Sequence, residues 1–379
     1  MKAQTIRTLL EINNHRLAVE TSINPAKKQI QSIVQLNDQT IHQREFYISK
    51  DQDDDKLIQE KLLPEAQKGL IAEIEVLFRI QSKVNENPTA DKCYMVGIIL
   101  MARGFYAEAL KQFQKVLGTN PKHIQAIKHY GIVLTLQGDF ENAKHVLTSA
   151  AETAPGYPDV LLYLGNVYLY QRHFEEAKQC YLAAVHINPG YAEAHLKLAT
   201  CALGVLANEN NNLVEAMIQE QVNEANKEAQ LAIQLNPRIA KSSILTGLQN
   251  IRDGKYPVAF KNFNDARPKY IPKTGAETIY FYTLKLLYGE KGVSPGETEV
   301  YINQLEQIVE ENPGYADVRL HYSVAHLIKS NFIVSRSLRE MNKAIETNPK
   351  FQKALASANV LSEIYKKMML AVKDIYRGE

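Results

Sequence analysis

The sequence predicts an all-α solenoid of stacked helical hairpins, preceded by a small antiparallel β meander at the N-terminus. The first reason is the spacing of Pro121, Pro155 and Pro189, which lie 34 residues apart. The second is that small and bulky apolar residues recur at fixed places between those prolines. The third is that the N-terminal segment lacks this period and alternates apolar and polar side chains instead. The chain therefore divides into a β-rich segment, residues 1–55, and a helical array, residues 56–379.

The β-rich segment has four sets of residues with the period of two that one face of a strand requires. Turn-forming residues separate the sets, at Asn13, Asn14, Asn24, Pro25, Asn37 and Asp38. The alternating positions are Ile6, Thr8, Leu10 and Ile12; Leu17, Val19, Thr21 and Ile23; Ile30, Ser32, Val34 and Leu36; and Phe46 with Ile48. We expect a four-stranded meander with one apolar face and two open edges. It can lean on the first repeats, pair with a second copy to form a homodimer, or accept a partner's strand.

The helical array repeats three side-chain positions, and each has a physical role. A small residue on the first helix of a hairpin lets the second helix cross closely. An alanine on the second helix does the same from the other side, and a bulky apolar residue one turn later fills the space beyond it. These positions are Gly97, Gly131, Gly165 and Gly247; Ala109, Ala143, Ala177, Ala225 and Ala259; and Phe113, Leu147, Tyr181 and Phe263. One hairpin cannot bury its own apolar face, so neighbouring hairpins must stack.

This pattern resembles the tetratricopeptide repeat, a helix-turn-helix unit of 34 residues with Gly, Ala and Pro at these places. The best-matching unit is 158–191, with Leu161, Leu164, Gly165, Tyr168, Ala177, Tyr181, Ala184 and Pro189. The resemblance implies a right-handed superhelix of about seven or eight repeats over residues 56–379, clearest at 90–239.

Within the array we expect a degenerate first unit and clear units, followed by weaker ones and a C-terminal capping helix. The expected bounds are 57–89 for the degenerate unit; 90–123, 124–157, 158–191 and 192–239 for the clear units; 240–273, 274–315 and 316–350 for the weaker units; and 351–376 for the cap. The unit at 192–239 holds a 14-residue insertion around 208–212, which we expect to lengthen both of its helices equally. The unit at 274–315 has a longer loop at 289–296.

The composition excludes several classes of function. A formal net charge of +2 over 379 residues gives no general electrostatic reason to bind nucleic acid or an anionic membrane. Cys93, Cys180 and Cys201 are scattered, which does not suggest a disulfide framework. No signal-peptide core and no run of ~20 apolar residues is evident, so we expect a cytoplasmic protein without direct membrane insertion.

Motifs of catalysis are also missing. The sequence contains no GxxxxGK[ST] phosphate cradle, no GxGxxG after a strand, no HExxH, and no Cys/His cluster with metal-ligand spacing. We therefore expect no enzymatic activity, no cofactor, no metal site and no catalytic residues.

In the family that the array resembles, the first helix of each unit lines a concave groove, and the resemblance implies which residues face it. These are Tyr94, Ile98, Lys128, Ile132, Leu162, Asn166, Tyr170, Leu196, Thr200, Ile244 and Leu248. Some of them can simply complete the packing between helices. The functional interpretation is a groove for an amphipathic helix or an extended peptide. The basic clamp with which some members hold heat-shock chaperones is not matched, because its places carry Tyr94, Ile98, His129, Asp159 and Tyr163.

The sequence thus favours a non-catalytic scaffold or adaptor that binds one or more proteins, as in a multiprotein assembly. One alternative is a regulatory subunit that docks on an enzyme and uses the β-rich segment as its effector. A helical-repeat protein that reads RNA is the least favoured alternative, because acidic Asp91, Asp159 and Glu193 also map to inward-facing positions beside these groove residues.

Overall fold

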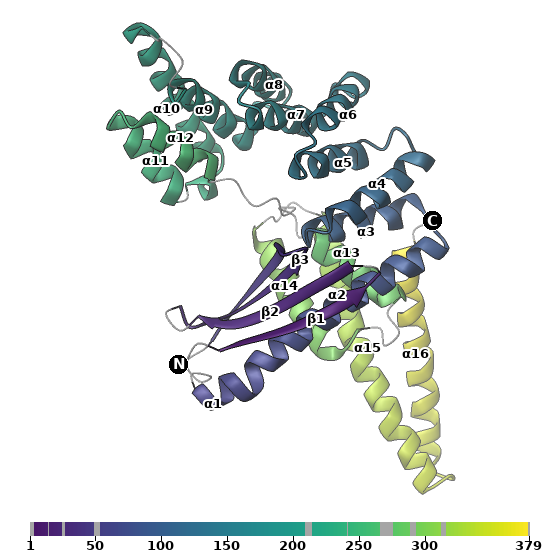
Figure 1. Ribbon diagram of the computed structural model, residues 1–379. Coiled ribbons are helices and arrows are strands. Elements are labelled where there is room, and N and C mark those ends of the chain that lie inside the picture. The colour runs from purple at the N-terminus through teal and green to yellow at the C-terminus, as the bar shows by residue number, and fades with distance from the viewer. Residues whose placement is uncertain are drawn as a thin grey trace. The chain divides into compact units, whose positions relative to one another are not determined.

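The computed structural model describes residues 4–13, 15–24, 27–48, 54–208, 214–240, 242–265, 276–288, 293–311 and 316–377 (Figure 1). The chain forms two compact units. The first, Met1–Pro88 with Pro272–Glu379, is called the sheet unit, and the second, Thr89–Ile271, is called the repeat unit. The predicted fold class, a helical-repeat array preceded by an antiparallel β meander, is confirmed.

The sheet is a meander of four antiparallel strands in the order β1-β2-β3-β4. Their bounds are β1 (Thr5–Ile12), β2 (His15–Asn24), β3 (Gln29–Leu36) and β4 (Gln39–Tyr47). The tight turn between β3 and β4 is made by Asn37 and Asp38, whose φ angles of 51° and 62° are those of a two-residue hairpin turn. Of the predicted turn residues, Asn14 and Pro25 lie outside the described residues.

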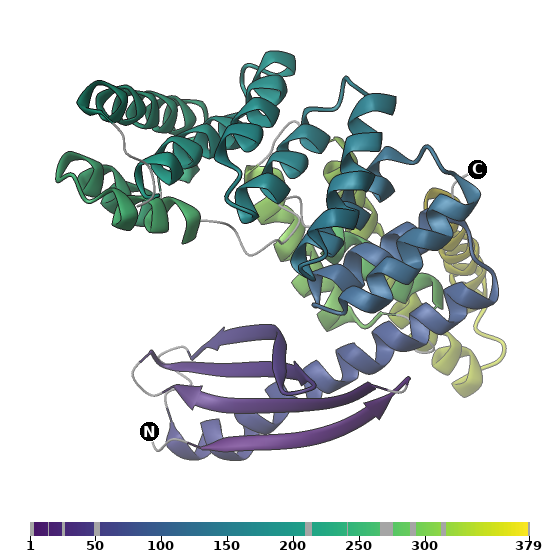
Figure 2. The same cartoon turned by 45° about the horizontal axis from the view of Figure 1, so that its top comes forward.

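The alternating residues predicted from the sequence share one face of this sheet. In the strand register Thr8 lies opposite Val19, and Val19 lies opposite Val34. That face is covered by α2 (Leu63–Glu86), and Figure 2 shows the helix running along the sheet. The buried Gln67 of α2 fixes the contact, because its Nε2 donates to the Val19 carbonyl oxygen at 2.8 Å.

The expected helical hairpin at 57–89 is wrong. The short α1 (Asp55–Leu57), a π-helical turn (Ile58–Leu62) and α2 follow one another without a reversal of the chain. No Gly or Pro follows Gly69 within α2, so nothing in this stretch stops the helix. The predicted boundary at residue 55 therefore separates the sheet from the helix that covers it.

Two more hairpins complete the sheet unit. One consists of α13 (Ala276–Tyr288) and α14 (Pro295–Glu311), which meet where Tyr282 stacks on Tyr301. The other consists of α15 (Ala316–Thr347) and α16 (Gln352–Arg377). The unit expected at 316–350 is thus one long helix, since no Gly or Pro interrupts α15. The expected capping helix is its antiparallel partner α16. Residues 289–292 of the predicted long loop lie outside the described residues.

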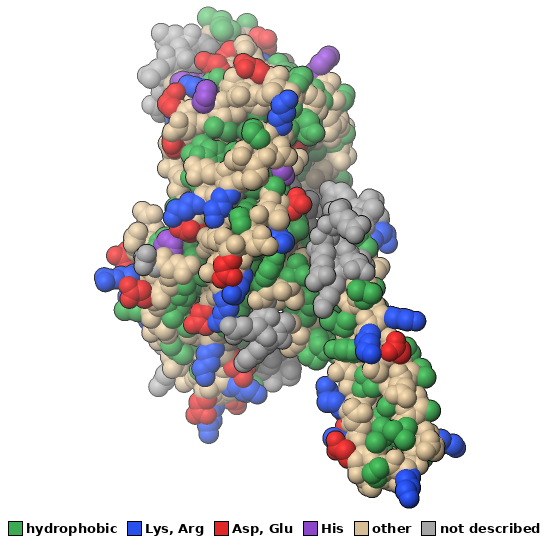
Figure 3. Space-filling model, turned by 90° about the vertical axis from the view of Figure 1, so that its right-hand side faces the viewer, with side chains coloured by type: hydrophobic (Ala, Val, Ile, Leu, Met, Phe, Trp, Pro, Cys, Tyr) green, Lys and Arg blue, Asp and Glu red, His purple; other side chains and the backbone are tan. Residues whose placement is uncertain are grey.

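The α15–α16 hairpin carries apolar side chains on its surface. It forms the lowest part of the view in Figure 3, where apolar side chains lie among lysines and arginines. Ile333, Val360 and Leu370 are exposed.

The repeat unit stacks five helical hairpins. Their helices are α3 (Ala90–Ala102) and α4 (Tyr106–Thr119), α5 (Ile124–Leu136) and α6 (Phe140–Thr153), α7 (Pro158–Tyr170) and α8 (Phe174–Ile187), α9 (Ala192–Leu206) and α10 (Glu215–Leu235), and α11 (Ser242–Arg252) and α12 (Tyr256–Asp265). Each second helix packs on the first helix of its own hairpin. The second helices α4, α6 and α8 also pack on the first helix of the next hairpin, which is α5, α7 and α9 respectively. The bounds agree with the units predicted at 90–273.

The small and bulky positions meet as predicted. A Cβ atom on Gly97 would lie 2.6 Å from the Phe113 ring, and one on Gly131 would lie 2.6 Å from Leu147. In the fourth hairpin Ala199 and Ala229 share one buried cluster and replace the glycine and the bulky residue. Two small side chains therefore stand here where the other hairpins pair a glycine with one large side chain.

The insertion in the fourth hairpin is not shared equally between its helices. α10 has 21 residues where α8 has 14, whereas α9 has 15 where α7 has 13. The second helix thus gains seven residues and the first gains two. Residues 209–213 of the insertion lie outside the described residues.

The fifth hairpin joins the stack in a different way. Its second helix, α12, packs directly against α9. Phe260 of α12 consequently reaches the buried cluster that α7, α8 and α9 share. This departure from regular stacking brings α12 close to the turn between α7 and α8.

Candidate functional site

The first helices α3, α5, α7 and α9 form what we call the first-helix face, on which one carboxylate links three hairpins. Lys128 of α5 places its Nζ 3.2 Å from Oδ2 of Asp159 on α7. The hydroxyl of Tyr191, which precedes α9, donates to Oδ1 of the same carboxylate at 2.8 Å. The Asp159 side chain nevertheless stays 44% exposed, whereas that of Lys128 is 10% exposed. This face therefore holds a fixed and accessible acceptor.

A buried histidine links α3 to α5 on the same face. Nδ1 of His129 lies 2.7 Å from the Gln125 carbonyl oxygen, which can only accept, so Nδ1 carries the hydrogen. The Tyr94 hydroxyl lies 3.2 Å from the same nitrogen. Burial, reinforced by the positive charge of Lys128, lowers the pKa of His129 from 6.5 to about 3. His129 is therefore neutral near pH 7.

The side chain of Asn166, at the middle of α7, is held in position by a residue of α8. The Tyr181 hydroxyl donates to Asn166 Oδ1 at 2.9 Å. Tyr181 reaches this place because Gly165 leaves room for its ring. No described residue accepts a hydrogen bond from Asn166 Nδ2, and the side chain is half-buried. The amide thus has its donor left for an incoming acceptor.

The structure divides the predicted groove residues into buried and accessible ones. Fully packed between helices are Ile98, Ile132, Leu162, Thr200 and Ile244, each 4% exposed or less. These five side chains belong to the interhelix core, which is the alternative that the sequence left open for some of the groove positions. Lys128 is also buried, in its pair with Asp159. Accessible to different degrees are the half-buried Tyr94, Asn166, Leu196 and Leu248, and Tyr170 at 41% exposed.

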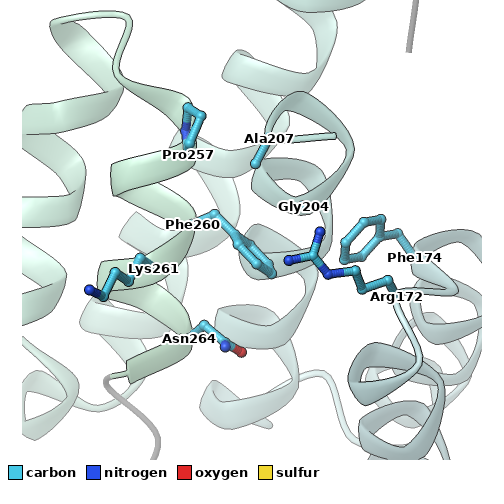
Figure 4. A pocket seen from close by; sticks show the side chains of 8 residues that line it. All are labelled: Arg172, Phe174, Gly204, Ala207, Pro257, Phe260, Lys261 and Asn264. Atoms are coloured by element: carbon cyan, nitrogen blue, oxygen red, sulfur yellow. The ribbon is translucent and has the colours of Figure 1, made fainter. Parts of the chain in front are cut away.

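A second feature of the repeat unit was not foreseen from the sequence. A cavity of about 300 Å³ lies between the turn that joins α7 to α8, the end of α9, and α12. Its lining includes Arg172, Phe174, Gly204, Phe260 and Lys261. Figure 4 shows the Phe260 ring pointing from α12 toward Arg172 and Phe174, whereas the Lys261 ammonium points away from them. The rings of Phe174 and Phe260 meet edge to face at 5.8 Å.

Two departures from the repeat pattern mark this cavity in the sequence. Arg172 stands where the first, second and fifth hairpins of the repeat unit have Gly104, Gly138 and Gly254. Gly204 stands where the preceding hairpin has Tyr170. The predictions from the sequence were based on positions at which the repeats agree, so Arg172 and Gly204, at which the repeats differ, were missed. The close approach of Phe260 could not be read from any repeat, since it depends on the packing of α12 on α9.

The three cysteines are free thiols whose pKa values are raised by burial. Burial raises the pKa of Cys180 to about 11 and that of Cys201 to about 12, and it also raises the pKa of Cys93. The thiols are therefore protonated near pH 7. Among the described residues, no three His, Cys, Asp or Glu side chains are gathered where they could bind a metal ion. The described helices also include none with the length and apolar character that a membrane span needs.

Comparison with known proteins adds the family. Two models of the tetratricopeptide repeat match the sequence, one over residues 94–158 and one over residues 134–195. No protein with a curated description matches the chain.

Several solved structures are similar to parts of the chain. MamA of Desulfovibrio magneticus RS-1 is 21% identical, with 47% of this chain and 92% of that one covered and a TM-score of 0.35. Pseudomonas aeruginosa pilF is 18% identical, with 62% and 95% covered and a TM-score of 0.37. A tetratricopeptide protein of Thermus thermophilus is 19% identical, with 54% and 99% covered and a TM-score of 0.31. These likenesses are too low to bear on function.

The assignment rests on the two family models and on the hairpins themselves, whose glycine, alanine and bulky positions meet as such repeats require. Residues 94–195 of the chain are therefore tetratricopeptide repeats.

Proposed function

We propose that the first-helix face binds an extended segment of a partner protein, which makes the chain a non-catalytic scaffold. The orientation of Asn166 is the observation that carries this proposal. Its Oδ1 is engaged by Tyr181, so its Nδ2 is available to a backbone carbonyl of a bound segment. An extended segment presents such carbonyls at regular spacing, whatever its side chains are.

The neighbouring side chains suit the same ligand. Tyr170, one turn after Asn166 on α7, and Leu196, on the next first helix α9, are accessible and can cover apolar side chains of the segment. Asp159 supplies an accessible acceptor for a backbone N–H or a basic side chain. Because Lys128, His129 and Tyr191 already hold their geometry before any ligand arrives, little further ordering is needed on binding.

The same arrangement disfavours nucleic acid as the ligand. Lys128, a cation predicted to face the groove, is paired with Asp159, and the remaining accessible charge on that pair is negative. A phosphate backbone requires unpaired cations along its path. The homodimer through the sheet edges and the regulatory use of the β-rich segment stay predictions. The face of the sheet that α2 covers is not available for either role.

The test is to place a photo-crosslinking residue at Tyr170 and to identify the proteins that it captures in extract of the native source. The matched position is Leu182, an exposed apolar residue on the second helix α8. We expect a discrete partner to be crosslinked from Tyr170 and not from Leu182.

The captured partner is then measured against two double variants of matched composition. Asn166→Ala with Leu196→Ala alters the first-helix face, and Gln179→Ala with Leu182→Ala alters the exposed side of α8. We expect the first pair to weaken binding at least tenfold and the second to leave it unchanged, with both proteins still helical by circular dichroism. Equal binding by the two double variants would refute the assignment of this face.

A further inference from the structure

Arg172 holds a backbone conformation that glycine adopts in three of the other hairpins of the repeat unit. Its φ angle is +61°, beside +77° for Gly104, +82° for Gly138 and +70° for Gly254. All four residues follow a first helix and close the same turn. In each case the next N–H donates to a carbonyl five residues back, as His173 N–H does to Tyr168 at 2.9 Å. An arginine pays a steric penalty in this region that glycine avoids, so its side chain is a candidate for a function.

The cavity beside Arg172 exists because one bulky side chain is missing. One repeat earlier, the ring of Phe140 on α6 stacks on the ring of Tyr170 on α7, with the two ring centroids 6.0 Å apart. The corresponding pair one repeat later is Phe174 and Gly204. A Cβ atom on Gly204 would lie 2.3 Å from the Phe174 ring, so the ring rests on the helix backbone. The Phe174 ring thereby fills the place where a side chain on Gly204 would begin, and α9 supplies no ring in the place that Tyr170 takes on α7.

The walls and the charge of this cavity suit one kind of group. Phe174, Pro257, Phe260 and Ala207 make most of the wall apolar. Arg172 and the more distant Lys261 are exposed cations, and neither side chain forms an ion pair with a carboxylate in the described part of the chain. A volume of about 300 Å³ lies at the lower end of small-ligand pockets, so it takes about one large side chain.

We propose that this cavity binds an apolar side chain of a partner peptide that is followed by a carboxylate. The apolar group packs in the cavity against the rings of Phe174 and Phe260, which form part of its wall. The carboxylate pairs with the guanidinium of Arg172, which can bind it through two parallel hydrogen bonds. Lys261 adds long-range attraction for the same charge. This site does not depend on the first-helix face and adds a second contact for partner proteins.

A peptide with tryptophan tests the proposal directly, because the chain contains no tryptophan of its own. The probe is acetyl-Gly-Trp-Glu-Gly-amide, whose indole is then the single tryptophan fluorophore in the mixture. Titration with the full chain should produce a saturable blue shift as the indole leaves water. Replacing Glu by Gln in the peptide should weaken binding about tenfold, because the charge-assisted contact with Arg172 is lost.

Three variants of the chain locate the site. Arg172→Gly should weaken binding of the Glu peptide about tenfold and leave that of the Gln peptide unchanged. Arg252→Ala, which removes an exposed cation of α11, is the charge-matched control and should bind both peptides as the wild type does. Ala207→Leu fills the cavity and should abolish binding of either peptide.

The outcomes that overturn the proposal are equally specific. They are the absence of saturable binding by the wild type in the low millimolar range, equal affinity for the Glu and Gln peptides, and wild-type affinity of the Ala207→Leu chain. The Asn166→Ala, Leu196→Ala chain should bind the peptide normally. If it did not, the peptide would occupy the first-helix face and not the cavity.

Discussion

The ring of Tyr181 occupies the place where a side chain on Gly165 would begin. A Cβ atom on Gly165 would lie 2.5 Å from Tyr181 Cε1, which is closer than two non-bonded carbon atoms come to each other in proteins. The ring is fully buried, and its hydroxyl holds Asn166 at 2.9 Å. A glycine in α7 thus determines both the spacing of α7 and α8 and the orientation of a candidate binding residue.

Gly165→Ala should therefore destabilise the repeat unit. Overpacking of this kind costs about 1–3 kcal/mol, since either the ring or the helix must shift, and Gly165→Leu should cost more. The matched control is Gly118→Ala on α4, where no atom lies within 4 Å of the added methyl group. There the better helix propensity of alanine should raise stability by up to about 1 kcal/mol. Urea unfolding measures both, and an unchanged midpoint for Gly165→Ala would contradict the packing described above.

Arg172→Gly should stabilise the repeat unit while it weakens the proposed peptide binding. Relief of the left-handed conformation is worth about 1–2 kcal/mol. Loss of a cation at the C-terminus of α7 offsets part of this, about 0.3–1 kcal/mol. We expect a net gain of about 1 kcal/mol in the free energy of unfolding. Arg252→Gly, on the last turn of α11, should instead lower stability because it adds glycine to a helix. If Arg172→Gly lowered stability, the arginine would be a structural residue.

His129 should make the repeat unit less stable in mild acid. Its pKa is about 3 in the folded chain and near 6.5 when unfolded, so between these values the unfolded chain binds one more proton. The contribution of His129 to the free energy of unfolding is fully present above pH 6.5, and it decreases as the pH falls toward 3. At pH 5 the loss is about 2 kcal/mol, from about 1.4 kcal/mol per pH unit.

The measurement for His129 compares unfolding free energies at pH 7 and pH 5. His129→Gln should remove about 2 kcal/mol of the difference between the two pH values. His145→Gln, at an exposed histidine of α6, should leave that difference as it is in the wild type. Identical pH dependence in all three proteins would mean that His129 is not buried in its neutral form.

Gln67→Ala should loosen the sheet from α2. The Gln67 side chain is buried and bonds to the Val19 carbonyl, the Thr8 hydroxyl at 3.1 Å and the Thr21 hydroxyl. Its removal leaves the buried Thr21 hydroxyl with fewer partners, at a cost of about 1–3 kcal/mol. Lys68→Ala, at the exposed neighbouring position, is the control and should be nearly neutral. Hydrogen exchange in β1 and β2 reports the change, and equal exchange in both variants would exclude Gln67 as the anchor.

The repeat itself could be predicted from sequence because each of its rules is local. A glycine and a bulky residue sixteen positions later, as Gly165 and Tyr181, meet in every hairpin that keeps a short turn. The strand faces followed from alternation for the same reason, and Thr8, Val19 and Val34 do share one face. The predictions of a hairpin at 57–89 and at 316–350 were wrong. Both segments have helical periodicity and end near a proline, but no residue in the middle of either one breaks the helix, so each forms one long helix.

Local patterns along the chain were enough to establish the class of fold, the hairpins from α3 to α12 and the face of the sheet that is buried, since these depend on the period of side chains within one segment. Tertiary packing was needed to distinguish Leu162, which is core, from Asn166, which is accessible, because burial depends on how closely the next helix approaches. The cavity likewise depends on that packing. Arg172, Gly204 and Phe260 are far apart in the chain, and they meet because α12 packs on α9.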